Sequence, residues 1–213
     1  NAMRTELKEI QANFGTTSIY VTHDFMEAMS LGDRIAIVNE GHIVQIGTGD
    51  EIYYMPCNEF VAQLMGDPEI NIIGGSLAKS GDGYTYTMNA GGKAYKLPMD
   101  KDLFKKFDEA GLDKIEMGMR PQHLKYSFEP KEGYLKCTVY SYESIGNKSV
   151  IVAETSGLQL RMIAPNGLSV KIDQDIYVDM QLDHAMFFDA GTKGYLTRYN
   201  EAAVRAIAAE QEG

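Results

Sequence analysis

His23 is the residue of this sequence whose type and setting are best suited to chemistry. It follows a short run rich in β-branched residues, Ser18–Thr22, and precedes Asp24 at the start of a segment with a helical pattern. An imidazole can donate a hydrogen bond from one ring nitrogen while a neighbour fixes the other, which suits the polarisation of a bound group. The position equally suits an ordinary histidine held by local hydrogen bonds. The local sequence therefore leaves both interpretations open.

The other residues capable of chemistry indicate no second site. Cys57 and Cys137 lie far apart, without the short spacing of a metal site, and two thiols without secretory features fit a reducing compartment. His42 and His184 stand alone in the sequence, so we expect surface or structural roles for them. The 13 tyrosines and 12 methionines are scattered over predicted strands, which favours a role in the core over a ligand pocket. We therefore predict no metal site.

The first part of the chain, residues 3–67, combines helical patterns with strand patterns and must position His23. Apolar residues at helical spacing, capping residues and a hairpin signal define its elements. These are a helix over Arg4–Phe14, a strand over Ser18–Thr22, a helix from Asp24 with Glu27 as capping partner, strands 34–39 and 42–46 joined through Glu40-Gly41, and short helices capped by Asp50 and Asn58.

The pattern changes at Gly66-Asp67-Pro68, where a glycine that ends the preceding helix is followed by a proline, which disfavours helix. We therefore place a domain boundary between residues 67 and 68. Residues 68–213 alternate short strand patterns with turn residues, which is typical of a small barrel or sandwich. Helices are predicted over 101–110 and, by propensity, over 201–210. The predicted strands are 84–88, 93–97, 115–119, 134–142, 149–154, 159–164 and 176–182.

Composition narrows the class of protein. Hydrophobic residues make up 44% of the chain and charged residues 23%, which predicts a globular protein with a real core. The formal net charge of −10 argues against a nucleic-acid partner and against direct binding to anionic lipid. The longest apolar runs have about four residues, against the ~20 that span a membrane. Any contact with a membrane system should therefore run through a protein partner.

Segments around His23 resemble a known family. Tyr20-Val-Thr-His-Asp24, followed by Glu27-Ala-Met29 and Asp33-Arg-Ile35, closely resembles the switch-histidine segment of ABC transporter ATPases. The stretch Gly41-His-Ile-Val-Gln-Ile-Gly47 resembles the hairpin that follows this segment in the family.

Later segments resemble one branch of that family, the MalK-like carbohydrate importers. Glu51-Ile-Tyr53, Pro56, Phe60-Val-Ala62, Gly66 and Pro68 are similar to the exit from its nucleotide-binding domain. Gly118-Met-Arg-Pro-Gln-His-Leu124 looks like its Gly-x-Arg-Pro-Glu-His-Leu motif, with Gln122 in place of glutamate. Glu143-Ser-Ile-Gly-Asn147 looks like its Glu-x-Leu-Gly-x turn, with Ile145 in place of leucine. The resemblance covers nearly the whole chain, with its motifs in the family's order.

The resemblance implies an α/β remnant of an ABC ATPase domain at 3–67, followed by a β-rich, OB-like (TOBE-type) regulatory barrel at 68–213. The family's switch histidine contacts the γ-phosphate of ATP, so His23 is the implied catalytic and ATP-contacting residue. The phosphate loop, the Leu-Ser-Gly-Gly-Gln signature and the apolar strand ending in Asp-Glu do not occur in this sequence. We therefore expect ATP and Mg²⁺ to be cofactors of a longer parent ATPase, and this chain alone to be inactive and to bind neither.

Family membership also implies partners and a location. The expected protein is a subunit of a bacterial sugar importer, cytoplasmic and held at the inner face of the membrane by its permease. Its expected partners are a second copy of itself, the permease subunits and possibly a regulatory protein, with no nucleic acid. Two alternatives stay open: an importer for polyamine, glycerol phosphate or an oxyanion, and a stand-alone regulatory barrel that is not an enzyme.

Three structural expectations follow from the family fold. Arg120, before Pro121, should have a structural role, since proline holds the residue before it in extended geometry. Glu143–Asn147 should form a tight turn in which Gly146 takes a positive φ. The strands that flank Ser18–Thr22 in the family are absent from this sequence, so we expect that segment to be rearranged or to pair with a new neighbour.

Overall fold

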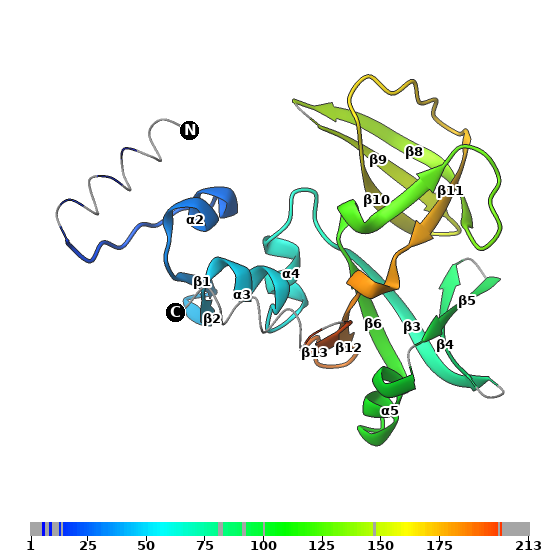
Figure 1. The fold of residues 1–213 in the computed structure, drawn as a ribbon, viewed down its shortest axis with the longest axis horizontal. Helices are drawn as coiled ribbons and strands as arrows, with labels where there is room; N and C mark the ends of the chain where they lie inside the picture. Colours follow the sequence, from blue (N-terminus) through cyan, green and yellow to red (C-terminus); the bar gives the residue numbers. More distant parts are fainter. Residues whose placement is uncertain are drawn as a thin grey trace.

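The computed structural model describes residues 6, 9, 13, 15–80, 83–90, 93–99, 101–146, 148–199 and 201. Figure 1 shows short helices and a two-stranded hairpin at the N-terminal side, next to a larger part made of β-strands. In the part of the chain described, no helix is long and apolar enough to cross a membrane.

The N-terminal elements are set by local capping and turn chemistry. They are α2 (Phe25–Leu31), β1 (Ile35–Asn39), β2 (His42–Gly47), α3 (Gly49–Tyr54) and α4 (Glu59–Leu64). Glu40 and Gly41, at φ 48° and 79°, form the turn between β1 and β2, as the hairpin signal predicts. Asn58 caps α4 as predicted, by accepting from Val61 N–H at 3.0 Å.

The cap of α3 differs from the prediction. Thr48, rather than Asp50, is the capping residue. The Thr48 hydroxyl accepts from Glu51 N–H at 3.2 Å, and the Glu51 carboxylate accepts from Thr48 N–H at 2.7 Å. Because this reciprocal pair satisfies two helix-end donors, the helix begins two residues earlier than the sequence pattern indicates.

The predicted strand Ser18–Thr22 is not formed. The segment has no strand assignment, and Ile19 and Val21 are 92% and 90% exposed. A strand needs ladder partners, and no described strand pairs with this segment. The predicted helix Arg4–Phe14 and the predicted helical tail 201–210 lie, except for residues 6, 9, 13 and 201, outside the described residues.

From Asn71 onward the chain is mainly β. A five-stranded antiparallel sheet has the order β10-β9-β8-β11-β7. Its strands are β7 (Leu124–Ser127), β8 (Leu135–Ile145), β9 (Lys148–Thr155), β10 (Leu158–Ala164) and β11 (Asp175–Met180). Buried and exposed residues alternate along the first half of β8, as expected for a sheet with one face on the core.

A six-stranded antiparallel sheet lies beside it, in the order β13-β12-β6-β3-β4-β5. Its strands are β3 (Asn71–Ser80), β4 (Gly83–Ala90), β5 (Lys93–Met99), β6 (Lys114–Met119), β12 (Met186–Asp189) and β13 (Tyr195–Arg198). Helix α5 (Lys101–Glu109) buries Leu103, Phe104 and Phe107, and 3₁₀ turns η1 (Pro121–His123) and η2 (Leu182–His184) link strands. The sequence patterns missed β3, β7, β12 and β13.

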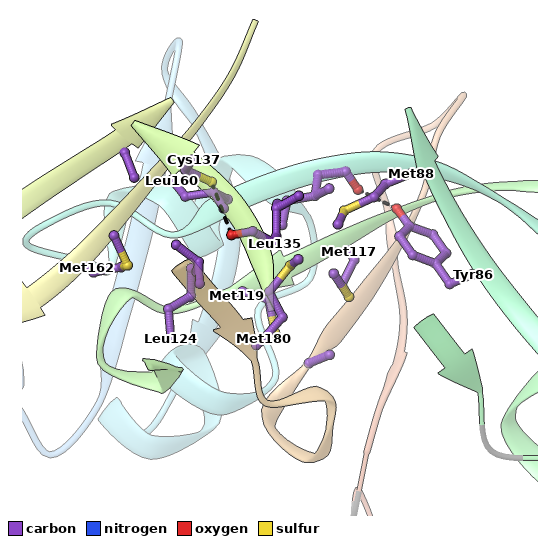
Figure 2. Close-up of a cluster of buried hydrophobic side chains, with 14 of the residues drawn as sticks. Tyr86, Met88, Met117, Met119, Leu124, Leu135, Cys137, Leu160, Met162 and Met180 are labelled. Carbon is purple, nitrogen blue, oxygen red and sulfur yellow. Dashed lines mark hydrogen bonds between the residues drawn. The ribbon is translucent and has the colours of Figure 1, made fainter. Parts of the chain in front are cut away.

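Both sheets contribute to one core. Figure 2 shows methionines of the two sheets directed at a shared interior, with Tyr86 at one side. Met88 and Met117 come from the six-stranded sheet, while Met162 and Met180 come from the five-stranded one, and all four are buried. These methionines are core residues, as predicted.

The buried side chain of Asn71 joins the two sheets by hydrogen bonds. Its amide donates to the carbonyls of Met119 and Arg161, each at 3.0 Å, and its oxygen accepts from Arg161 N–H at 2.7 Å. The predicted fold class, an α/β segment followed by a β-rich OB-like domain, is confirmed. Its strands form two sheets rather than the single closed barrel expected. The boundary at residues 67 and 68 stays a prediction; Ala62 packs across it with Ile70 and Phe188.

Candidate functional site

His23 lies in an exposed bend directly before helix α2. The following residue, Asp24, is the N-cap of that helix, and its carboxylate accepts from the N–H groups of Met26 at 2.8 Å and Glu27 at 3.1 Å. The cap fixes where the helix starts, so it also fixes the backbone that presents His23 to solvent.

Thr22 and Glu27 brace the same bend. The Thr22 hydroxyl donates to the Glu27 carboxylate at 2.8 Å and accepts from Asp24 N–H at 3.0 Å. The Tyr20 hydroxyl donates to the same carboxylate at 3.3 Å. Thr22 thus joins the cap, a role that the sequence pattern did not assign to it. The result is a bend held on both sides of His23, in which His23 itself is exposed.

This arrangement offers a single exposed imidazole, followed in the chain by two acidic residues, Asp24 and Glu27. Within the described residues, the bend brings no lysine or arginine to His23 by hydrogen bond or ion pair.

Arg120, in the Gly118–Leu124 motif, has a clear structural role. Its side chain is 3% exposed and donates to the carbonyls of Tyr53 at 2.6 Å, Met65 at 3.0 Å and Ala62 at 3.4 Å. The guanidinium also lies 3.7 Å from the centre of the Tyr53 ring. These carbonyls are at the C-terminal ends of α3 and α4, where a cation is favourable. Burial lowers the pKa of Arg120 to about 10.

A second arginine, Arg198, repeats this arrangement. It is buried and donates to the carbonyl of Tyr54 at 3.1 Å, with its guanidinium 5.5 Å from the centre of the Tyr54 ring. Burial lowers its pKa as well. Gln122, the residue that departs from the family's glutamate, donates to the Tyr53 hydroxyl at 2.8 Å. No sequence pattern pointed to Arg198, because its partner Tyr54 is remote in the chain.

The Glu143–Ile145 end of β8 leads into the predicted tight turn. Gly146 has φ 60°, as expected, and its carbonyl accepts from the Asn166 amide at 2.5 Å. Asn147 lies outside the described residues. Lys148, just after the turn, contacts the carbonyl of Asp67 at 2.5 Å and its carboxylate at 3.2 Å. The turn is thus tied to the segment that connects the two parts of the chain.

The remaining histidines and cysteines lie in three different settings. His184 was expected to stand alone, but its ring stacks on that of His123, with centres 3.9 Å apart. Burial, and secondly the neighbouring His184, lowers the pKa of His123 to about 4. Cys137 is buried, which raises its pKa to about 12, and Cys57 is exposed. Among the described residues, no group of three or more His, Cys, Asp or Glu side chains could hold a metal ion.

Comparison with known proteins finds proteins of similar sequence. No family model matches the chain. The sn-glycerol-3-phosphate import ATP-binding protein UgpC of Vibrio cholerae is 32% identical over 197 residues, which are 91% of this chain and 50% of that protein. The trehalose/maltose import ATP-binding protein MalK of Thermococcus litoralis is 31% identical over 199 residues, 89% of this chain and 51% of that protein.

One solved structure overlaps part of the chain. The molybdate-bound cytoplasmic molybdate-binding protein ModG covers 55% of this chain with 94% of its own, at 10% identity and a TM-score of 0.43. That degree of similarity supports no statement about ligands. The sequence relatives are more informative, although the chain spans only about half their length. Since they match about nine-tenths of it, this chain belongs to the family of MalK-like ABC importer ATP-binding subunits.

Proposed function

We propose that this chain is part of the ATP-binding subunit of a bacterial ABC sugar importer, which couples ATP hydrolysis to uptake through a membrane permease. The observation that carries the proposal is the match of 89% of the chain to the trehalose/maltose import protein MalK of Thermococcus litoralis. The braced, exposed bend at His23 is consistent with it, because a switch histidine must reach a ligand outside its own segment.

Within this proposal the two parts of the chain have different tasks. Residues 3–67 would supply His23 to the ATP site, and residues 68–213 would form the regulatory domain that holds two copies together. ATP and Mg²⁺ would be bound in the longer parent protein, because the phosphate loop that would hold them does not occur in this sequence. The parent would be cytoplasmic and peripheral to the membrane, with permease subunits and a regulatory protein as partners.

Glycerol phosphate import is the second candidate. The UgpC relative of Vibrio cholerae has 32% identity and the MalK relative 31%, over nearly equal shares of this chain. The two identities therefore do not discriminate between a sugar and sn-glycerol 3-phosphate. Selection of the transported compound would rest with the permease and binding protein, so the substrate has to be identified by uptake rather than from this chain.

The test is a pair of measurements on the protein encoded by the complete reading frame. ATP hydrolysis by the assembled importer should fall at least about a hundredfold in His23→Ala, the order of effect expected for one essential electrostatic group. The matched control is His42→Ala, an exposed histidine in the β1–β2 hairpin, which should retain activity. Hydrolysis that persists in His23→Ala would overturn the role of His23.

Uptake then distinguishes the two importers. A strain that depends on this importer should accumulate labelled maltose or trehalose if the sugar assignment is right. Accumulation of labelled glycerol 3-phosphate instead would establish the second candidate. If the purified full-length protein has no ATPase activity in any assembly, the stand-alone regulatory protein becomes the correct assignment.

A further inference from the structure

Three chain segments meet at the N-terminal end of helix α4. They are residues 57–59, strand β6 and the turn between β12 and β13. Glu59 N–H donates to the carbonyl of Lys193 at 3.0 Å, and Tyr195 N–H donates to the carbonyl of Cys57 at 3.0 Å. The helix is therefore joined to the six-stranded sheet by backbone bonds on both sides of Asn58.

Two carboxylates and one ammonium lie at this junction. Glu59 is 9% exposed, and its Oε1 has no hydrogen-bond partner, although Lys193 Nζ lies 3.7 Å away. Lys193 Nζ forms its closer ion pair with Glu116 of β6. Glu59 and Glu116 therefore approach the same ammonium and are neighbours. Two neighbouring carboxylates beside a single ammonium are difficult to ionise together, and burial further disfavours the charged form of Glu59, so the cluster contains a proton-binding position.

Glu59 is the group that takes this proton. Its burial, followed by the proximity of Glu116, raises its pKa from 4.5 to about 7. Glu116 behaves in the opposite way: burial opposes ionisation, but hydrogen bonds from Glu59 and Lys193 outweigh it and lower its pKa. Asp189, at the start of the same turn, is half-buried and accepts from Gly191 and Thr192 N–H at 2.7 Å each.

We propose that Glu59, Glu116 and Lys193 form a proton-dependent latch that holds helix α4 to the six-stranded sheet in mildly acidic solution and loosens as Glu59 ionises. The two ionised carboxylates then repel each other, and the single ammonium of Lys193 cannot pair closely with both. The three groups come from three segments, so a change in their charge acts on the attachment of the helix rather than within one element.

The pH window follows from the direction of the Glu59 shift. A carboxyl group whose pKa is higher in the folded than in the unfolded protein contributes stability at pH values below its unfolded pKa. For Glu59 this contribution is complete below pH 4.5 and is lost as the pH rises to about 7. Complete loss would correspond to a roughly 300-fold change in the opening equilibrium, because the pKa of Glu59 rises from 4.5 to about 7 on folding. Because solvent reaches part of the cluster, we expect about tenfold.

Glu116 and His123 do not account for this window. The lowered pKa of Glu116 gives a contribution that is lost only as the pH falls below about 4.5. The lowered pKa of His123 gives stability that is present above pH 6.5 and lost towards pH 4, which has the opposite sign to the effect of Glu59. A local measurement at α4 is therefore needed, since global stability would combine both effects.

Amide hydrogen exchange supplies that measurement. The Glu59 and Tyr195 amides report directly on the two junction bonds, and the Ile151 amide in the five-stranded sheet serves as an internal reference. Between about pH 5.5 and about pH 8.5, the protection factors of Glu59 and Tyr195, corrected for intrinsic exchange, should fall about tenfold relative to Ile151. Equal protection at both pH values would overturn the latch.

Three variants identify the groups responsible. Glu59→Gln keeps a hydrogen-bond donor towards Glu116 without a titratable group, so its protection should no longer depend on pH. Glu116→Gln should lower the pH at which the protection of the Glu59 and Tyr195 amides is lost, because Glu59 then lacks its anionic neighbour. The matched control Glu69→Gln, at an exposed glutamate, should behave like the unaltered chain. Carbon NMR titration of Glu59 in the unaltered chain checks the assignment: ionisation near pH 4.5 would refute it, whatever the variants' stability.

Discussion

Replacing Arg120 by methionine tests whether the arginine–proline motif holds α3 and α4 in place. Methionine retains most of the length of the side chain but has no donors. The carbonyls of Tyr53 and Met65 would lose their donors at 2.6 and 3.0 Å, in a place where the arginine side chain is 3% exposed. The Ala62 contact at 3.4 Å is at the limit of a hydrogen bond and is not counted.

The magnitude follows from two bonds. A hydrogen bond that involves a charged group contributes about 1.5–3 kcal/mol, so the two together contribute about 3–6 kcal/mol. Part of this loss is offset, because the variant no longer carries a cation into the interior, as the lowered pKa of Arg120 indicates. We expect the free energy of unfolding to decrease by about 2–4 kcal/mol.

Urea unfolding followed by circular dichroism measures this difference, with equal slopes required for the comparison. Arg34→Met, at an exposed arginine in the same part of the chain, is the matched control and should change stability by no more than about 0.5 kcal/mol. If Arg120→Met also stays within about 0.5 kcal/mol of the unaltered chain, the carbonyl contacts do not hold these helices and the reasoning is refuted.

Three further predictions concern packing, nucleotide and assembly. Gly75→Ala would place a Cβ 2.4 Å from the Tyr86 ring and should lower the free energy of unfolding in urea by about 1–3 kcal/mol. If Gly75→Ala costs as much in a Tyr86→Ala background as in the unaltered chain, this clash is not the cause. Calorimetry of this chain with Mg²⁺ and ATP should detect no binding tighter than about 100 μM, and tighter binding lost in His23→Ala would contradict this. Light scattering should give the mass of a homodimer, whose interface we expect to bury at least ~1,200 Å², mainly through residues after Asp67. The mass of a monomer would exclude this dimer.

Local chemistry made several elements predictable from the sequence. Asp24 and Asn58 cap their helices, and Glu40-Gly41 turns the hairpin, because each depends on residues within four positions in the chain. The long strands of the five-stranded sheet were likewise visible, since one face of each packs on the core. His23 could be placed directly before a helix for the same reason, although the strand predicted ahead of it is not formed and its role still rests on the family resemblance.

Features that depend on distant partners could not be predicted. Strand β3, which no sequence pattern indicated, contains Gly75, and Gly75 leaves room there for the Tyr86 ring, which comes from β4. Ser18–Thr22 has strand composition but no partner among the described strands. The contact of Arg198 with Tyr54 and the stacking of His123 on His184 bring together residues that no local pattern connects.

The Asn71 amide has a consequence beyond joining two sheets. β10 is an edge strand, and the exposed peptide groups of an edge can add a strand from another molecule. At Arg161 both peptide groups on that edge are already bonded, because the asparagine side chain carries the same donor and acceptor as a peptide unit. Asn71 thus acts as a one-residue substitute for a neighbouring strand, and at Arg161 the edge offers no peptide group to a strand of another molecule.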